Sequence, residues 1–301
     1  MTHAGPDFLA AVDRAVGWHK WCQAHTKGDT ALAPYVDKHN VKAVVAKLAP
    51  TLRVAREYLY ATDAAQITDA AVARLPARFM MKGAHMSGGV VLVDGDSVKC
   101  LKPAEGAPCP KRGPDEPPAS YLRRYCAKLL RITYGVRKGE MLYRDVPKGC
   151  VLEEQFDVSG GDFQDYKVWV FHGRVLFVHI DSDRFGTHKR NFRTPSWVEI
   201  GMADGGGYRY EKNDALRRAP PPFLPALLEH ARQLAAPFPY VRADFFVFNG
   251  DTHVFSELTF AHDSCKGGRL GFVPKRAEQF YGYAVAHPEA RIDPELILQL
   301  V

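Results

Sequence analysis

The segment FPYVRADFFVFNGDTHVFSELTF, residues 238–260, contains two runs of aromatic and β-branched residues around an Asn-Gly-Asp turn. Such runs predict a β-hairpin with strands over 241–248 and 252–258. If the glycine and the following aspartate form the turn, Asp244 and Glu257 lie directly opposite each other on one face, with Cβ atoms roughly 5 Å apart. The hairpin therefore indicates antiparallel sheet in the carboxyl-terminal part of the chain.

Two opposed carboxylates repel each other, so a cation must offset their charge. A divalent metal does so, and carboxylate oxygens suit Mg²⁺. Arg242 and Thr259 share the face of the two acids, because side chains alternate along a strand. Arg242 therefore offers a second explanation, in which it neutralises Asp244 and Glu257 as a structural ion pair. The hairpin alone leaves both explanations open.

Upstream of the hairpin, strand patterns alternate with turns and a few helices. Apolar runs predict strands over 79–82, 90–93, 98–101, 151–156, 166–171 and 174–180. Apolar periodicity predicts helices from Phe8 to Cys22, after Asp37, over 120–132 and over 222–236. Strands joined mostly by hairpins predict an α+β fold (mixed α/β) rather than a parallel Rossmann sheet. The sequence contains no Gly-x-Gly-x-x-Gly or Walker loop.

Composition and charge exclude several classes of protein. A length of 301 residues suggests about two domains, and no apolar run approaches the roughly 18 residues that cross a bilayer. The net charge of +6 favours anionic ligands, but no Lys/Arg block or RNA-binding signature is present, so no nucleic-acid partner is expected. The 6 cysteines are scattered, so neither a structural zinc site nor a disulfide framework is expected. The amino terminus lacks an apolar signal segment, which makes the cytoplasm the expected location.

Three further segments carry candidate ligand groups. Lys82 leads into a loop of small residues ending at Gly89, whose amides could hold phosphate, although a plain hairpin is the simpler explanation of that pattern alone. The strand residues Glu153 to Phe156 could hold adenine, or they form an ordinary strand with exposed acids. Polar and cationic residues collect after Ile180, either as a site for carboxylate or phosphate or as a solvated loop.

The order of these segments, over nearly the whole chain, resembles the ATP-grasp superfamily. The closest resemblance is to its TupA-like branch, which is associated with teichuronopeptide and other surface-polysaccharide biosynthesis. The residues that carry it are Asp37-Lys38, Leu75-Pro76, Phe79 to Gly89, Leu152-Glu153-Glu154, Asp165-Tyr166-Lys167, Asp181 to Arg184, Arg190-Asn191-Phe192, Phe238 to Asp244 and Glu257 to Phe260.

The resemblance implies an ATP-grasp fold, in which two α+β subdomains sandwich ATP. It divides the chain into a mainly helical amino-terminal region over 1–75 and an ATP-grasp nucleotide-binding and catalytic region over 76–301. Within the latter, a small phosphate-loop subdomain covers 76–155, and a metal and substrate subdomain covers 156–301.

The resemblance also implies cofactors and residue roles. ATP would be held by Lys38, Lys82, His85, Ser87, Gly88, Gly89, Glu153, Glu154, Gln155, Phe156 and Asp165. Mg²⁺, with Mn²⁺ as an alternative, would be bound by Asp244, Glu257 and Thr259. The catalytic residues would be Arg242, which stabilises the transferring phosphoryl group, and the acceptor-binding cations Arg184, Arg190 and Lys167.

The implied activity is ATP- and Mg²⁺-dependent ligation of a carboxylate to an amine through an acyl phosphate. The acid would be a small molecule or a glycan or peptide precursor. Two alternatives stay open: a kinase acting on a sugar or other small alcohol, and a nucleotide-binding module without turnover. The chain departs from the family pattern at Thr259, where most ATP-grasp ligases have asparagine, and in its short amino-terminal region.

Overall fold

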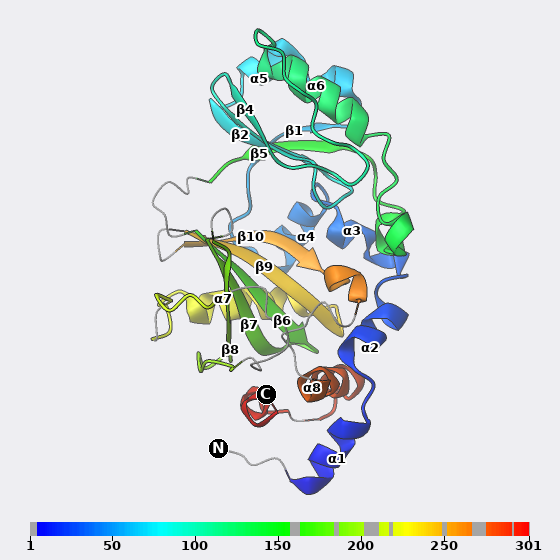
Figure 1. The fold of residues 1–301 in the computed structure, drawn as a ribbon, viewed down its shortest axis with the longest axis vertical. Coiled ribbons are helices and arrows are strands. Elements are labelled where there is room, and N and C mark those ends of the chain that lie inside the picture. Colours follow the sequence, from blue (N-terminus) through cyan, green and yellow to red (C-terminus); the bar gives the residue numbers. More distant parts are fainter. Residues whose placement is uncertain are drawn as a thin grey trace. The chain divides into compact units, whose positions relative to one another are not determined.

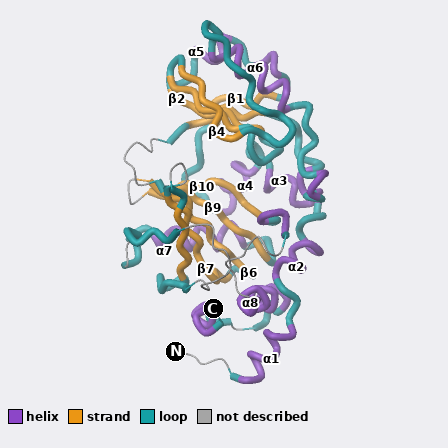
Figure 2. The backbone as a smooth tube through the Cα atoms, in the orientation of Figure 1, coloured by secondary structure: helices purple, strands orange, loops and turns teal. Residues whose placement is uncertain are grey.

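The computed structural model describes residues 5–156, 163–183, 187–201, 211–216, 219–248, 252–266, 275–290 and 292–300. The chain divides into two compact units. Unit 1 comprises Met1–Lys27, Val45–Arg53 and Val158–Val301, and unit 2 comprises Gly28–Val44 and Val54–Asp157. Each unit contains one five-stranded sheet, and its neighbouring strands all pair antiparallel (Figures 1 and 2). The fold is therefore mixed α+β, as the hairpin pattern predicted.

The sheet of unit 2 has the strand order β1-β5-β2-β3-β4. Its strands are β1 (Glu57–Ala61), β2 (Arg78–Gly83), β3 (Val90–Asp94), β4 (Ser97–Lys102) and β5 (Cys150–Glu154). Helix α6 (Pro118–Leu129) packs against β2 and α5 (Asp69–Ala73). Proline at the first position suits a helix start, and buried residues recur three or four apart at Leu122, Cys126 and Leu129. This apolar stripe joins the core of unit 2.

The sheet of unit 1 has the strand order β10-β9-β6-β7-β8. Its strands are β6 (Gln164–Phe171), β7 (Arg174–Ser182), β8 (Lys189–Arg193), β9 (Tyr240–Phe248) and β10 (Thr252–Thr259). Helix α7 (Leu224–Ala235) contacts β6, β7 and β9 through a stripe that includes Leu227, Ala231 and Leu234. Helix α7 thereby covers one face of this sheet, and other residues lie on the opposite face.

The amino-terminal segment forms two helices, α1 (Pro6–Arg14) and α2 (Trp18–His25), where one was predicted. Both contact α8 (Lys275–Ala286) (Figure 1). The break between them coincides with a close approach, because a Cβ atom at Gly282 of α8 would lie 1.8 Å from the carbonyl oxygen of Val16. A glycine on α8 and extended backbone at Ala15 and Gly17 thus let the three helices pack.

The first 75 residues do not form a region of their own, unlike the predicted division. Trp18 is buried with Trp169 and Tyr240 in the core of unit 1, whereas β1 hydrogen-bonds to β5 in unit 2. Apolar burial in one case and backbone pairing in the other assign these residues to different units. The later boundary, near residue 157, lies close to the predicted one.

The remaining elements are short. They are η1 (Thr30–Leu32), α3 (Ala33–Val36), α4 (Val41–Leu48), η2 (Ala64–Gln66), η3 (Val136–Lys138), η4 (Met141–Tyr143), η5 (His262–Cys265) and η6 (Pro294–Gln299). Asp37 precedes α4 by a turn, and its carboxylate accepts a hydrogen bond from the His39 amide at 2.9 Å. Its carbonyl oxygen accepts from the Val41 amide, also at 2.9 Å, so the aspartate caps the entry to α4, as predicted.

The structure contains two disulfides, so the expectation that the scattered cysteines form no disulfide framework was wrong. Cys22 of α2 is bonded to Cys265 of η5, and Cys100 is bonded to Cys109. The first pair is 243 residues apart in sequence, so only the tertiary fold brings it together. Among the helices that the structure describes, none has the length and apolar character needed to traverse a bilayer.

Candidate active site

The hairpin of β9 and β10 places Asp244 opposite Glu257, as predicted, but by a different route. Near the turn, Thr252 pairs with Phe248, which is one residue away from the predicted register. A bulge at Ser256 then shifts the pairing so that the two acids meet. The predicted turn residues 249–251 lie outside the described part of the chain.

Arg242 and Asp244 form a buried ion pair on this hairpin, with side chains 5% and 2% exposed. Arg242 Nε donates to Asp244 Oδ1 at 2.7 Å, and Nη2 donates to Oδ2 at 2.6 Å. Nη2 also donates to Thr259 Oγ1 at 3.1 Å. Glu257 lies 3.9 Å from the same nitrogen, and its side chain is 52% exposed. The ion pair thus engages both oxygens of Asp244, while Glu257 faces outward.

The pairing register brings further polar residues to the face of Asp244. Directly across the sheet from Asp244 lie Lys167 on β6 and then His179 on β7. In the next row, Asp165 on β6 is followed by Asp181 on β7 and by Arg190 on β8. Because directly paired residues share a face, the five strands present two adjacent rows of polar and charged groups on that face.

Asp181 is the centre of this network. Its carboxylate accepts from Arg190 Nε at 2.7 Å and lies 2.9 Å from His179 Nε2 and 3.0 Å from His188 Nε2. Lys167 Nζ lies 3.5 Å away and also contacts Asp165. Burial alone would raise the pKa of Asp181, but the surrounding cations and imidazole hydrogen bonds outweigh it and hold the pKa well below its usual value. Asp181 is therefore ionised.

This network changes the charge expected at the predicted acceptor site. Lys167 and Arg190 are not free positive charges, because Asp165 and Asp181 neutralise them. Arg184 lies outside the described residues. The sequence predicted no role for Asp181. Its position two residues after His179 on a strand is the pattern that could have indicated a shared network.

Unit 2 contains a separate ionic cluster around Glu153 of β5. Its carboxylate, 6% exposed, accepts from Lys82 Nζ at 2.6 Å and from Lys42 Nζ at 2.5 Å. Burial would raise the pKa of Glu153, but the two lysines outweigh it and lower the pKa. Glu153 is therefore a buried counter-ion of Lys82 and not an exposed acid, while its role toward adenine stays a proposal. Lys42 was not predicted from the sequence.

The loop after Lys82 makes hydrogen bonds and close backbone contacts with other residues of unit 2. His85 is 2% exposed, and its Nδ1 accepts from the Gly149 amide at 3.3 Å. Gly88 and Gly89 have φ angles of 92° and 67°, and a Cβ at Gly88 would lie 2.5 Å from the Pro103 carbonyl oxygen. The turn itself therefore requires glycine. Ser87 is exposed, and its hydroxyl accepts from Lys102 Nζ at 3.2 Å.

Of the other predicted nucleotide-binding residues, Asp165 lies in unit 1, and the rest belong to unit 2 with the Glu153 cluster. The Lys38 amide donates to Ala84 O at 3.2 Å, which fixes the lysine beside the loop. Glu154 accepts from the Arg56 amide at 3.1 Å, and the Gln155 side chain donates to Phe156 O at 2.8 Å. These contacts leave the roles of Glu154, Gln155 and Phe156 as proposals.

The carboxylates of the hairpin fit a magnesium ion that substrate oxygens complete. Within the described ranges, no three His, Cys, Asp or Glu side chains are grouped as a metal centre. Mg²⁺ in phosphate-handling sites commonly takes only one or two carboxylates and fills its octahedron with water and phosphate oxygens. Asp244 and Glu257 match that donor set, with Glu257 the accessible member.

Mutation can distinguish the role of Lys82 from that of Lys42. Both contact Glu153, so replacing either with alanine removes one of its two cations. If Lys82 binds phosphate, Lys82→Ala raises KM for ATP roughly 10- to 100-fold, the value of a charge-assisted hydrogen bond. Lys42→Ala is the matched control and is expected to change KM by less than about threefold. Equal KM values in steady-state ATP titrations of the two variants would contradict a phosphate role for Lys82.

His85 predicts a pH dependence of stability. Burial is the main cause that lowers its pKa to about 4. The unfolded chain binds the proton near pH 6.5, so this contribution to stability is present above pH 6.5 and declines as pH falls toward 4. The loss by pH 4.5 is about 2.5 kcal/mol. His85→Asn places Oδ1 where Nδ1 accepts and does not titrate, so denaturant unfolding at pH 7.0 and 4.5 should show a smaller decline. An unchanged decline would contradict the assignment.

Comparison with known proteins gives one family and several distant structures. The family model described as "TupA-like ATPgrasp" matches residues 19–285. The structure is similar to D-cycloserine synthetase DcsG, with 15% identity and a TM-score of 0.46, over 90% of this chain and 78% of that chain. It is similar to N5-carboxyaminoimidazole synthetase from Staphylococcus aureus complexed with ADP, with 10% identity and a TM-score of 0.44, over 86% and 54%.

A third similar structure is ATP-grasp ligase PsnB with a variant of its minimal precursor, Mg and ADP. It has 12% identity and a TM-score of 0.41, over 89% of this chain and 64% of that chain. In three PsnB structures the chain spans 59%, 50% and 64% of that ligase. Among curated proteins, none matches the sequence significantly.

Proposed function

The chain belongs to the TupA-like ATP-grasp family, and from this premise we propose that it is an ATP- and Mg²⁺-dependent ligase that joins a carboxylate to an amine. The observation that carries the proposal is the hairpin of β9 and β10. There an arginine, two carboxylates and a hydroxyl share one strand face. This is the set of groups needed beside a transferring phosphoryl group.

We assign the roles as follows. Lys82, oriented by Glu153, binds ATP phosphate, with Lys38, the 85–89 loop and residues 154–156 as its neighbours in the nucleotide site. Asp244 and Glu257 bind Mg²⁺, and Thr259 supports Arg242. When bound, the metal supplies positive charge to the phosphates. The acid would be a small molecule or a glycan or peptide precursor, in keeping with polysaccharide biosynthesis.

The proposed reaction has two steps. A carboxylate oxygen of the acid attacks the γ-phosphorus, the bond to the β-phosphate oxygen breaks, and ADP leaves. The amine nitrogen then attacks the acyl carbonyl carbon, phosphate leaves with the electrons of the C–O bond, and the nitrogen releases one proton to solvent. Arg242 stabilises negative charge on the phosphoryl oxygens, because its guanidinium is fixed in place by Asp244 before the reaction begins.

The polar row on β6, β7 and β8 is proposed to orient the acceptor. Arg190 is held in a two-point pair by Asp181, so the acid would bind beside that pair and not in place of it. Arg184 is retained as a further acceptor cation. The cytoplasm is kept as the proposed location. Because cytosolic thiols are normally reduced, alkylation of the freshly isolated protein would report whether the two disulfides exist there.

Hydroxylamine trapping tests the ligase. Candidate acids are incubated with ATP, Mg²⁺ and hydroxylamine, and hydroxamate and ADP are both quantified. A ligase captures the activated acid as a hydroxamate with one ADP per product, whereas omission of the acid abolishes both. If ATP binds but no acid or alcohol releases ADP, the chain is a binding module and the proposal fails.

A kinase is the second candidate, and one observation favours it. Asp165 and Asp181 neutralise Lys167 and Arg190, so the described part of the acceptor row carries little net positive charge. A neutral alcohol is compatible with such a surface. The kinase would produce a stable phosphate ester in the absence of any amine, and that product would resist hydroxylamine.

A further inference from the structure

The guanidinium of Arg242 has a partner that the sequence did not indicate, the ring of His262. Asp244 takes Nε and Nη2, and Nη1 contacts His262 Nδ1. Because a guanidinium only donates, Nδ1 accepts, and the ring proton lies on Nε2. Burial, followed by the charge of Arg242, holds the pKa of His262 well below its usual value, so the lone pair stays available. His262 thus contacts Nη1, the guanidinium nitrogen that Asp244 does not bind.

The aromatic ring of Trp169 also lies beside the Arg242 guanidinium. The guanidinium carbon lies 6.0 Å from the centre of the Trp169 ring. The His262 ring packs edge-on against Trp169, with centroids 5.3 Å apart. Trp169 is itself buried against Trp18 and Tyr240. The arginine is therefore positioned by a carboxylate, an imidazole and a rigid indole, and the imidazole is the only one of these three on a turn.

The turn that carries His262 has an uncommon backbone. Asp263, Ser264 and Cys265 are three consecutive non-glycine residues in the left-handed region, with φ angles of 46°, 57° and 52°. Residues with a Cβ rarely adopt this conformation even singly. The turn therefore needs contacts from elsewhere in the fold to stay in place.

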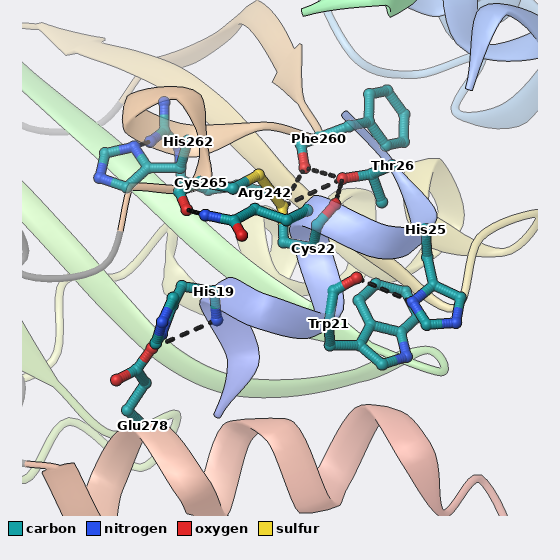
Figure 3. The surroundings of a disulfide bond; sticks show 11 residues. His19, Trp21, Cys22, His25, Thr26, Arg242, Phe260, His262, Cys265 and Glu278 are labelled. Atoms are coloured by element: carbon teal, nitrogen blue, oxygen red, sulfur yellow. Dashed lines mark hydrogen bonds and ion pairs between the residues drawn. A yellow bond between two sulfur atoms is a disulfide. The ribbon is translucent and has the colours of Figure 1, made fainter. Parts of the chain in front are cut away.

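Helix α2 supplies those contacts (Figure 3). Cys22 is disulfide-bonded to Cys265 at the end of the turn. Gln23 Nε2 donates to the Cys265 carbonyl at 2.6 Å, and Thr26 Oγ1 donates to the Phe260 carbonyl at 2.8 Å, just before the turn. Residues at the end of α2, together with its C-cap residue Thr26, thus hold the turn on both sides of His262.

We propose that His262 is a positioning residue for Arg242, and that the disulfide between Cys22 and Cys265 holds the turn that carries it. The inference rests on the proposed function, since Arg242 acts on the phosphoryl group there. Its consequence is that groups on an amino-terminal helix control turnover without touching substrate.

Two variants of His262 test the positioning. His262→Phe keeps an aromatic ring against Trp169 but removes the acceptor, and it should lower kcat roughly 10- to 100-fold with KM for ATP within about twofold. His262→Asn places Oδ1 near the position of Nδ1, and it should retain kcat within about threefold of the unmodified enzyme. Equal kcat values for both variants and the unmodified enzyme would overturn the proposal, and so would a loss that appears only in KM.

A spectroscopic readout separates this proposal from the proposed function. The Arg242 ¹⁵Nε–¹H signal is assigned by its absence in Arg242→Lys. It should persist in His262→Asn, and in His262→Phe it should shift or broaden through faster exchange with water. If the unmodified chain releases no ADP with any acid, the ligase proposal fails, and this signal still decides the positioning. An unchanged signal in His262→Phe overturns it.

The disulfide is tested in a Cys100→Ser/Cys109→Ser background, in which Cys22–Cys265 is the remaining disulfide and Cys126 and Cys150 are free thiols. A dithiol reductant becomes a cyclic disulfide while the protein gains two thiols. Reduction, verified by mass, should lower kcat roughly 3- to 10-fold, leave KM for ATP within about twofold, and be reversed by reoxidation. If kcat is unchanged in the fully reduced protein, the disulfide does not hold the turn.

Discussion

Replacing Arg242 with lysine is expected to lower kcat by at least about 100-fold, the typical cost of losing one fixed donor to a developing negative charge. Arg242 bonds Asp244 through Nε and Nη2 at once, donates to Thr259 through Nη2 as well, and contacts His262 through Nη1. The single ammonium of lysine cannot reproduce this planar fork. Steady-state kinetics with saturating ATP measure the loss, and ATP affinity should change much less.

The control for this substitution is Arg276→Lys. Arg276 also bonds an aspartate through two nitrogens, both at 2.9 Å, but its partner Asp13 is exposed and lies outside the proposed site. The control should leave kcat unchanged. If folded Arg242→Lys kept the kcat of the unmodified enzyme, Arg242 would be only the structural counter-ion of Asp244.

Replacing Glu257 with glutamine is expected to lower kcat roughly 10- to 100-fold and to raise the Mg²⁺ concentration needed for half-maximal activity. The side chain is 52% exposed and lies opposite Asp244, so the change removes a proposed metal ligand and little packing. The melting temperature should therefore stay the same. Mn²⁺ binding in the presence of ADP, followed by electron paramagnetic resonance, gives a readout independent of turnover.

Glu229→Gln is the matched control, because Glu229 is a similarly exposed acid of the same unit on α7. Asp244→Asn should also abolish Mg²⁺-dependent turnover. Unlike Glu257→Gln, it leaves Arg242 buried without its counter-ion, which costs on the order of 3–5 kcal/mol. Activity and Mn²⁺ binding of Glu257→Gln that equal those of Glu229→Gln would contradict the metal site.

The elements of the fold were largely predictable because their signals are local. Alternating apolar residues indicated both strands of the hairpin at Asp244 and Glu257, and short turns indicated antiparallel sheet. The register was less accessible, since the bulge at Ser256 has no sequence signature. The break between α1 and α2 was missed because it depends on Gly282, far along the chain.

The residue types of the site were predictable from the sequence, but the contacts between those residues were not. Lys82 and Glu153 were both singled out, but their ion pair joins residues 71 apart, and the sequence does not indicate such a contact. His262 and Cys22 gave no signal, because one acts from a turn and the other pairs with Cys265 across the chain. Charged residues after Ile180 suggested free cations, whereas their carboxylate partners determine the net charge.

The most direct test of the ligase proposal follows oxygen from the acid into phosphate. An acid that supports ADP release is labelled with ¹⁸O in both carboxylate oxygens and incubated with ATP, Mg²⁺ and the amine. Because an acyl phosphate forms through a carboxylate oxygen and then breaks at the acyl carbon, each released phosphate should carry one ¹⁸O. Phosphate without ¹⁸O, or a stable phosphorylated product in place of free phosphate, would contradict ligation through an acyl phosphate.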